Sequence, residues 1–238
     1  MMSLDYASAF GPGVLAATSD TGFDFHQPDR RGTGSFPLTP SQQAWLLGLG
    51  VDRPERVVFP KQVHGDGVWV ADENSAKERG TFQADAVVTN LAGLPVAVRT
   101  ADCLPVLIFS PQARAVAAVH AGWKSTQMRI VIKTVGTLRS LYGADPGGLK
   151  VVFGPCIRLS SYAVGEEFRG FFPGSVQELN GRLCFDLAGE NRRQMVSAGV
   201  LAGNIQDCGL DTVTRKELHS FRRDGERSGR MISVIMMA

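Results

Sequence analysis

The amino-acid sequence predicts a single α+β domain in which mixed, largely antiparallel β-sheets are layered with helices. Short apolar runs bounded by turn residues recur between residues 57 and 120, as is typical of buried strands. Ser110–Gln112 lies between two such runs and indicates a tight turn that joins antiparallel strands. Neither GxGxxG nor GxxxxGK(S/T) occurs in the sequence, so a doubly wound parallel sheet that binds nucleotides is not expected.

The apolar runs place the strands, and apolar spacing places the helices. We expect strands at Val14–Thr18, Val57–Phe59, Gly67–Ala71, Ala84–Thr89, Pro95–Thr100, Pro105–Phe109, Arg114–Val119, Leu149–Phe153, Leu183–Asp186 and Met231–Met236. We expect helices at Gln42–Leu47, Met128–Leu141, Tyr162–Phe171 and Ala188–Ala198. Thr39 or Ser41 would start the first helix, and Gly143 would end the second.

Length and composition limit the class of protein. A chain of 238 residues is long enough for one domain with a large core, so we expect residues 1–238 to form one domain. Residues 1 to about 45 form a divergent, loop-rich start, with a long loop over Pro28–Pro40. A formal charge of +2 gives no reason to expect nucleic acid or membranes as partners.

The cellular compartment and the state of the cysteine thiols can be inferred from features that the sequence lacks. We find no signal peptide pattern and no apolar run long enough to span a membrane. The four cysteines show no CxxC spacing. We therefore expect a cytoplasmic protein whose thiols are free.

A cluster of arginines near the end of the chain has two interpretations. Arg222, Arg223, Arg227 and Arg230 lie close together and are interrupted by acidic residues. The cluster is either a solvated turn or a local anion site.

Three residues suggest a metal centre. His64 lies in a connection between two expected strands, Cys103 follows a buried strand, and His120 ends another. Imidazole nitrogen and thiolate sulfur are ligands that zinc prefers, and three protein ligands leave a fourth position open, as in catalytic sites. The alternative is structural, because histidines beside glycine often serve turns and cysteines after strands often serve cores.

Six short strings sharpen this hypothesis. They are KQVHG (61–65), TADCLPV (100–106), AAVHAGW (117–123), FGPCI (153–157), VGEEF (164–168) and RRDGERSGR (222–230). Together, over about residues 57 to 236, they resemble the laccase-domain or multicopper polyphenol oxidoreductase-like family, also called the peptidoglycan editing factor or purine nucleoside phosphorylase family. The resemblance implies that His64, Cys103 and His120 bind one metal ion, usually zinc.

The resemblance also implies an activity, and the sequence offers candidate residues for it. It implies phosphorolysis of adenosine, inosine and methylthioadenosine, and deamination of adenosine, with a purine nucleoside and phosphate as partners. Asp102 beside Cys103 would carry a proton or support the metal ligands, or would only cap a strand. Lys61 or Arg223 would neutralise phosphate, and Gln62 is a further candidate for substrate binding.

One segment departs from the family pattern. Residues 14–35 read VLAATSDTGFDFHQPDRRGTGS, where relatives usually have a glycine-rich loop and a SLNLG-like string that closes over the substrate. The metal ligands are therefore present, while the segment that would close over the substrate departs from the family pattern.

Three other functions remain open at this stage. A copper-dependent phenol oxidase is disfavoured, because four histidines cannot supply several copper centres. A cysteine hydrolase would use Cys103 as nucleophile and His120 as base. A metal-binding protein without catalytic activity is the third alternative.

Overall fold

The structure is a computed structural model that describes residues 3–26 and 36–238. Its strands form one six-stranded sheet, one four-stranded sheet and a separate two-stranded ribbon. The six-stranded sheet has the order β11 (Ile205–Asp207), β8 (Lys150–Phe153), β6 (Leu104–Ser110), β7 (Ala115–Ala121), β4 (Ala86–Thr89) and β3 (Val68–Val70). The four-stranded sheet has the order β1 (Leu4–Asp5), β2 (Val14–Thr18), β12 (Met231–Met237) and β5 (Val96–Thr100), and the ribbon pairs β9 (Val176–Leu179) with β10 (Arg182–Phe185).

Most neighbouring strands are antiparallel. The exceptions within the named strands are β3 with β4 and β8 with β11, which pair in parallel. The predicted α+β class with largely antiparallel sheets is therefore confirmed.

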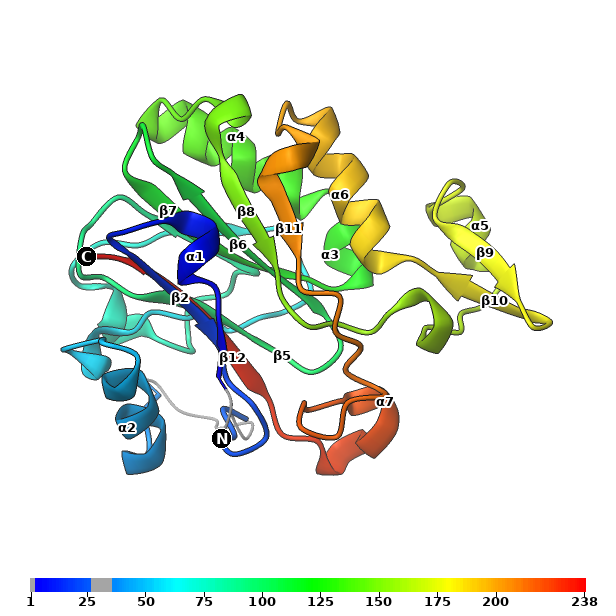
Figure 1. Ribbon diagram of the computed structural model, residues 1–238, viewed down its shortest axis with the longest axis horizontal. Coiled ribbons are helices and arrows are strands. Elements are labelled where there is room, and N and C mark those ends of the chain that lie inside the picture. The colour runs from blue at the N-terminus through cyan, green and yellow to red at the C-terminus, as the bar shows by residue number, and fades with distance from the viewer. Residues whose placement is uncertain (1–2, 27–35) are drawn as a thin grey trace.

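Helices cover the sheets on opposite sides of the molecule. The described helices are α1 (Ala7–Phe10), α2 (Pro40–Gly48), α3 (Trp123–Gln127), α4 (Ile130–Tyr142), α5 (Glu167–Phe171), α6 (Leu187–Ser197) and α7 (Phe221–Asp224). In Figure 1, α4, α6 and α3 lie along the six-stranded sheet, and α2 lies beside the four-stranded sheet at the lower left. The ribbon β9–β10 and α5 project together at the right of the same view.

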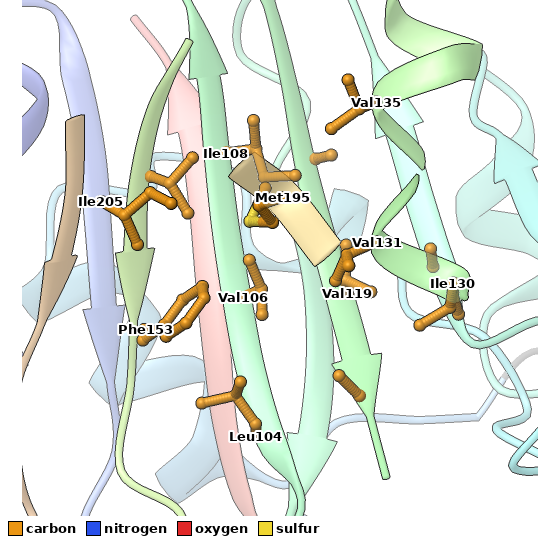
Figure 2. Packing of buried hydrophobic residues seen from close by; sticks show 14 of the residues in the cluster. Leu104, Val106, Ile108, Val119, Ile130, Val131, Val135, Phe153, Met195 and Ile205 are labelled. Carbon is orange, nitrogen blue, oxygen red and sulfur yellow. The ribbon is translucent and has the colours of Figure 1, made fainter. Parts of the chain in front are cut away.

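The central strands β6, β7 and β4 of the six-stranded sheet are buried on both faces, so their sequences are largely apolar. Every residue of β7 is buried. Because side chains alternate along a strand, Val106 and Val119 pack under α4 and α6, whereas Leu107 and Val116 pack toward the four-stranded sheet. Figure 2 shows the first of these layers, with Met195 of α6 over the strands. The far face of the four-stranded sheet packs against α2.

Most predicted elements are present, and the differences have local causes. Val57–Phe59 is not a strand but makes one isolated bridge, from Val58 to Val96, because Pro60 lacks the amide proton that would extend the pairing. The helix predicted over Tyr162–Phe171 is confined to α5, because Ala163 pairs with Cys184 in an extended bridge.

The structure also contains elements that the sequence did not indicate. β1, α1, β9, β11 and α7 are all short, and periodicity cannot identify so few residues. The long loop expected over Pro28–Pro40 lies largely outside the described residues.

Local signals at helix ends were reliable. Thr39 caps α2 with a complete capping box that includes Gln42, and Gly143 ends α4 in the left-handed conformation. All four cysteines are free thiols, as expected. Among the described residues, no helix has both the length and the apolar character required to cross a membrane.

Two glycines of α4 should respond oppositely to replacement by alanine. Gly136 lies in the exposed middle of α4 with open space around its Cα, so Gly136→Ala should raise the free energy of unfolding by about 0.5–1 kcal/mol. Gly143 has a φ of 69°, so Gly143→Ala should lower it. Urea unfolding of both variants beside the unmodified chain measures this, and equal shifts would contradict it.

Candidate metal centre

His64, Cys103 and His120 meet at one edge of the six-stranded sheet. His120 belongs to β7 and pairs with Pro105 of β6, so the register of this hairpin brings Cys103, just before β6, next to His120. His64 comes from the connection that precedes β3. The candidate donor atoms of the three residues all lie within 4.8 Å of one another, and Cys103 Sγ is 4.0 Å from His64 Nε2.

This arrangement suits a metal ion. Ligands on one tetrahedral zinc ion lie about 3.3–3.8 Å apart, given zinc–nitrogen and zinc–sulfur distances near 2.1 and 2.3 Å. The two imidazole rings are nearly perpendicular, with centroids 4.8 Å apart, so they do not stack on each other. Small movements would bring all three donors onto one ion. The group therefore could hold a metal with three protein ligands.

Gly122 keeps the space between the ligands open. A Cβ atom added at this position would lie 3.1 Å from Cys103 Sγ and 3.1 Å from His64 Cδ2. The φ of Gly122 is −74°, which any residue can adopt, so its backbone does not require glycine. Close approach of the ligand side chains therefore explains why a glycine fits here.

Asp85 connects two of the ligands to the sheet. It is fully buried, and its Oδ1 lies 2.8 Å from Nδ1 of His120. This contact leaves the other ring nitrogen of His120 for the metal and fixes the orientation of the ring. The main-chain N–H of His120 also donates to the carbonyl oxygen of Asp85 at 2.7 Å. Both the ring and the backbone of His120 are thus tied to one residue.

The same carboxylate orders the loop that carries His64. Its oxygens accept hydrogen bonds from the main-chain N–H groups of Val63, His64 and Gly65 at 3.1, 3.0 and 2.7 Å. His64 has a φ of 57°, a left-handed conformation that is unfavourable for a residue with a side chain. Three hydrogen bonds to a buried carboxylate compensate for this backbone strain.

The charges in the centre favour a thiolate. Burial alone would raise the pKa of the Cys103 thiol, but the nearby His120 and His64 lower this pKa to about 6. Burial alone would lower the pKa of His120, but Cys103 and Asp85 raise it to about 9. Burial also acts to raise the pKa of Asp85, and the contact with His120 and the loop N–H groups lowers it below its usual range. A cation in the centre would replace the proton of His120 and pair with the thiolate.

Asp102 has its carboxylate occupied. Its Oδ1 accepts a hydrogen bond from the Thr212 hydroxyl at 2.5 Å, and its Oδ2 accepts one from the main-chain N–H of Arg222 at 2.6 Å. Its carbonyl oxygen accepts from the N–H of Ile157, and its φ is 86°. Asp102 therefore ties the Cys103 turn to three later positions of the chain, Ile157, Thr212 and Arg222.

The three other predicted site residues, Gln62, Arg223 and Lys61, differ in their contacts. The Gln62 side chain binds the backbone of Arg99, donating to its carbonyl at 2.7 Å and accepting from its N–H at 2.8 Å. The guanidinium of Arg223 contacts Asp224 and several main-chain carbonyls, including those of Thr212 and Leu218. These contacts occupy the donors that phosphate would need. Lys61 is exposed, three residues before His64.

An aromatic cluster borders the centre beyond Gly122. Trp123 stacks on Phe171 at 6.1 Å between ring centroids, and the Lys124 ammonium lies 5.5 Å from the Trp123 ring. The Trp123 ring therefore packs within this cluster. Phe171 is 40% exposed.

Sequence reasoning missed Asp85 and Gly122. Asp85 lies at the start of an expected strand, where an aspartate usually means little, and the only available signal was a charged residue inside an apolar run. Gly122 stands inside the AAVHAGW string, but only the positions of His64 and Cys103 reveal its role.

Replacement of Asp85 should weaken metal binding without removing a ligand. In Asp85→Asn, the amide nitrogen cannot accept the hydrogen bonds that now hold the His64 loop, so metal affinity should fall about 10- to 100-fold. Competition with a chromophoric chelator measures the affinity. The control is Asp66→Asn, in the same loop, because Asp66 pairs with Lys133 at the surface. Equal affinities for the two variants would contradict the assigned role.

The low pKa of Cys103 predicts its reactivity in chelator-treated protein. Because the thiolate is the nucleophile, the rate of alkylation by iodoacetamide should rise with pH to a midpoint near 6. Cys208 is the internal control, since burial raises the pKa of its thiol and should leave it unreactive at neutral pH. Peptide mass mapping distinguishes the two sites. A Cys103 midpoint at about 8.5, the ordinary thiol value, would show that the histidines do not stabilise the thiolate.

The chain is similar to a known protein family and to a solved structure. The profile of the family described as multi-copper polyphenol oxidoreductase laccase matches residues 41–238. The solved structure of the hypothetical protein YfiH from Bacillus licheniformis shares the fold, with a TM-score of 0.82 and 24% identity over 94% of this chain and 93% of that chain.

Two curated relatives are enzymes by name. A purine nucleoside phosphorylase of Deinococcus radiodurans is 38% identical over 197 residues, or 81% of this chain and 73% of the relative. Adenosine deaminase RL5, from an unknown prokaryotic organism, is 35% identical over 225 residues, or 87% of this chain and 84% of the relative. With these relatives and a family profile that covers most of its length, this chain belongs to the multi-copper polyphenol oxidoreductase laccase family.

Proposed function

We propose that this protein is a zinc-dependent purine nucleoside phosphorylase that cleaves adenosine, inosine and methylthioadenosine. The observation that carries the proposal is the group of His64, Cys103 and His120, which offers three protein ligands and, within residues 3–26 and 36–238, no fourth. Such an incomplete ligand set is typical of catalytic zinc sites, whereas structural sites have four protein ligands. The name of the Deinococcus radiodurans relative supports the choice of substrate class.

The donor chemistry supports zinc in preference to magnesium or calcium. One thiolate and two imidazoles are soft or borderline ligands, whereas magnesium and calcium select oxygen ligands. A zinc ion bound there would supply a Lewis acid that stabilises negative charge developing on the substrate. Several copper centres, as the family description would require, find little support, because the only cluster of three or more candidate ligands among the described residues is this one.

The residues of the chain supply position and charge. Asp85 holds His120 and the His64 loop, so the ligands are preorganised before substrate arrives. Asp102 holds the Cys103 turn and is proposed as a positioning residue, since both its oxygens already accept hydrogen bonds. Lys61 is exposed next to this loop and is proposed to attract phosphate by its charge.

Deamination of adenosine is a second proposed activity of the same centre. The specific observation in its favour is the similarity to adenosine deaminase RL5 over 87% of this chain. Both reactions use a purine nucleoside, so one binding site would serve both. A cysteine hydrolase is less consistent with the site, because a metal on Cys103 would occupy the nucleophilic thiolate.

Phosphorolysis predicts a product that depends on phosphate. Zinc-loaded protein should convert inosine to hypoxanthine and ribose 1-phosphate only when phosphate is present, and Cys103→Ala should lose both stoichiometric zinc and activity. Cys208→Ala is the matched control, because it removes a thiol outside the ligand group. Chromatography of the nucleosides and bases, with elemental analysis of each protein, provides the measurement.

The same assay separates the two activities. Conversion of adenosine to inosine without phosphate is deamination, whereas adenine release that requires phosphate is phosphorolysis. If zinc-loaded protein converts none of adenosine, inosine and methylthioadenosine under either condition, the proposal is wrong and a role in metal binding alone becomes the better account.

A further inference from the structure

Among the described residues, Arg99 is a cation without an anionic partner. It lies in β5, where its Nε is buried and has no hydrogen-bond partner in the part of the chain that the structure describes. Its guanidinium carbon lies 4.9 Å from the centroid of the Phe59 ring, and its Nη2 makes one long contact of 3.4 Å with the carbonyl oxygen of Pro60. Within residues 3–26 and 36–238, no ion pair to Arg99 is found. Because its Nε is buried without a partner among the described residues, the charge of this partly buried side chain is costly to the fold.

A second arginine lies at the end of the same strand pair. Arg99 pairs with Ile232 of β12, and Arg230 directly precedes β12, two positions before Ile232. The period of two along a strand, continued to Arg230, makes the two arginines diagonal neighbours. Burial and then the charge of Arg230 lower the pKa of Arg99 to about 10, which agrees with their proximity. The Arg230 guanidinium donates to the carbonyls of Ser228 and Gly229 and forms no ion pair with a described carboxylate.

Carboxylates near these arginines do not neutralise them. The Oδ1 of Asp24 accepts from the main-chain N–H groups of Arg230 and His26, and no contact with either guanidinium is present among the described residues. Two other arginines of this protein have more hydrogen bonds than Arg99. Arg79 donates to three main-chain carbonyls, and Arg158 forms an ion pair with Asp207. Among the described arginines, only Arg99 has a buried nitrogen without a hydrogen-bond partner.

The pair is close to the metal centre. Arg99 precedes Cys103 by four residues, which limits the distance between their Cα atoms to about 14 Å. The Gln62 side chain, two residues before His64, holds the main-chain N–H and carbonyl of Arg99. The position of Arg99 is thus coupled to the segments that carry two of the three ligands.

We propose that Arg99 and Arg230 form an oxyanion site that binds inorganic phosphate. Two guanidinium groups on one face, with donors left over, match the charge and geometry of a tetrahedral oxyanion. This site replaces Arg223, whose donors are occupied, as the phosphate-binding element of the RRDGERSGR string. Its use as a co-substrate site rests on the proposed phosphorolysis, but the binding of phosphate does not.

Thermal unfolding of zinc-loaded protein tests the binding directly. Phosphate should raise the unfolding midpoint of the unmodified chain in a saturable manner, relative to chloride of equal ionic strength. Arg99→Met and Arg230→Met should lose this rise. Arg99→Met should also unfold in chloride at or above the midpoint of the unmodified chain, because it removes a buried charge that lacks a partner. Arg192→Met is the matched control, since Arg192 likewise lies over an aromatic ring, that of Phe153, 5.7 Å away.

Several outcomes would overturn the assignment. They are an unchanged phosphate response in Arg99→Met, or the absence of a response in the unmodified chain. A third is an Arg99-dependent response to adenosine 5′-monophosphate but not to phosphate, which would assign the site to a nucleotide phosphate group.

Kinetics separate this site from the proposed function. If phosphorolysis occurs, Arg99→Met should raise the KM for phosphate by about 10- to 100-fold, with the KM for inosine and the zinc content little changed. Phosphorolysis with an unchanged KM for phosphate would reject the site and keep the function. Arg99-dependent phosphate binding without any turnover would keep the site and reject the function.

Discussion

The buried carboxylate of Asp85 is the interaction on which the candidate site depends. It lies directly before β4, contacts the ring of His120 on the neighbouring strand, and accepts hydrogen bonds from three N–H groups of the His64 loop. A charge without solvent is stable only when it is fully hydrogen-bonded, so the loop and the ring are both required. The sheet in turn fixes Asp85, because both faces of β4 and β7 are packed. The packing of the core thereby fixes the positions of the metal ligands.

The sequence allowed the metal ligands to be predicted but not their support. Histidine and cysteine are rare in this chain, so His64, Cys103 and His120 could be recognised from their strings. The role of Asp85 depends on which strand lies beside β4. The sequence around Asp85 does not indicate which strand that is. Gly122 and Arg99 are similar cases. The close contacts that favour glycine at position 122, and the lack of a partner for Arg99 among the described residues, can be recognised only in the folded chain.

Most of the strands and longer helices could be predicted because their sequence patterns are local. Strands that are buried on both faces, such as β6 and β7, are continuous apolar runs that need no tertiary information to be seen. Short elements at the margins, such as β1 and β11, form only because an existing strand offers free backbone groups. The segment Val57–Phe59 has the apolar character of a strand but forms only one bridge, because the following Pro60 has no main-chain N–H.

The place of β12 in the four-stranded sheet has a consequence for biosynthesis. This strand lies between β2 and β5, and both of its partners precede it by a long stretch of chain. While the ribosome is still translating the intervening residues, β2 and β5 present unsatisfied backbone edges that other nascent chains can pair with. The four-stranded sheet therefore closes late, by insertion of β12 into a prepared gap. Chaperone dependence and aggregation during rapid expression should both reflect how long that gap stays open.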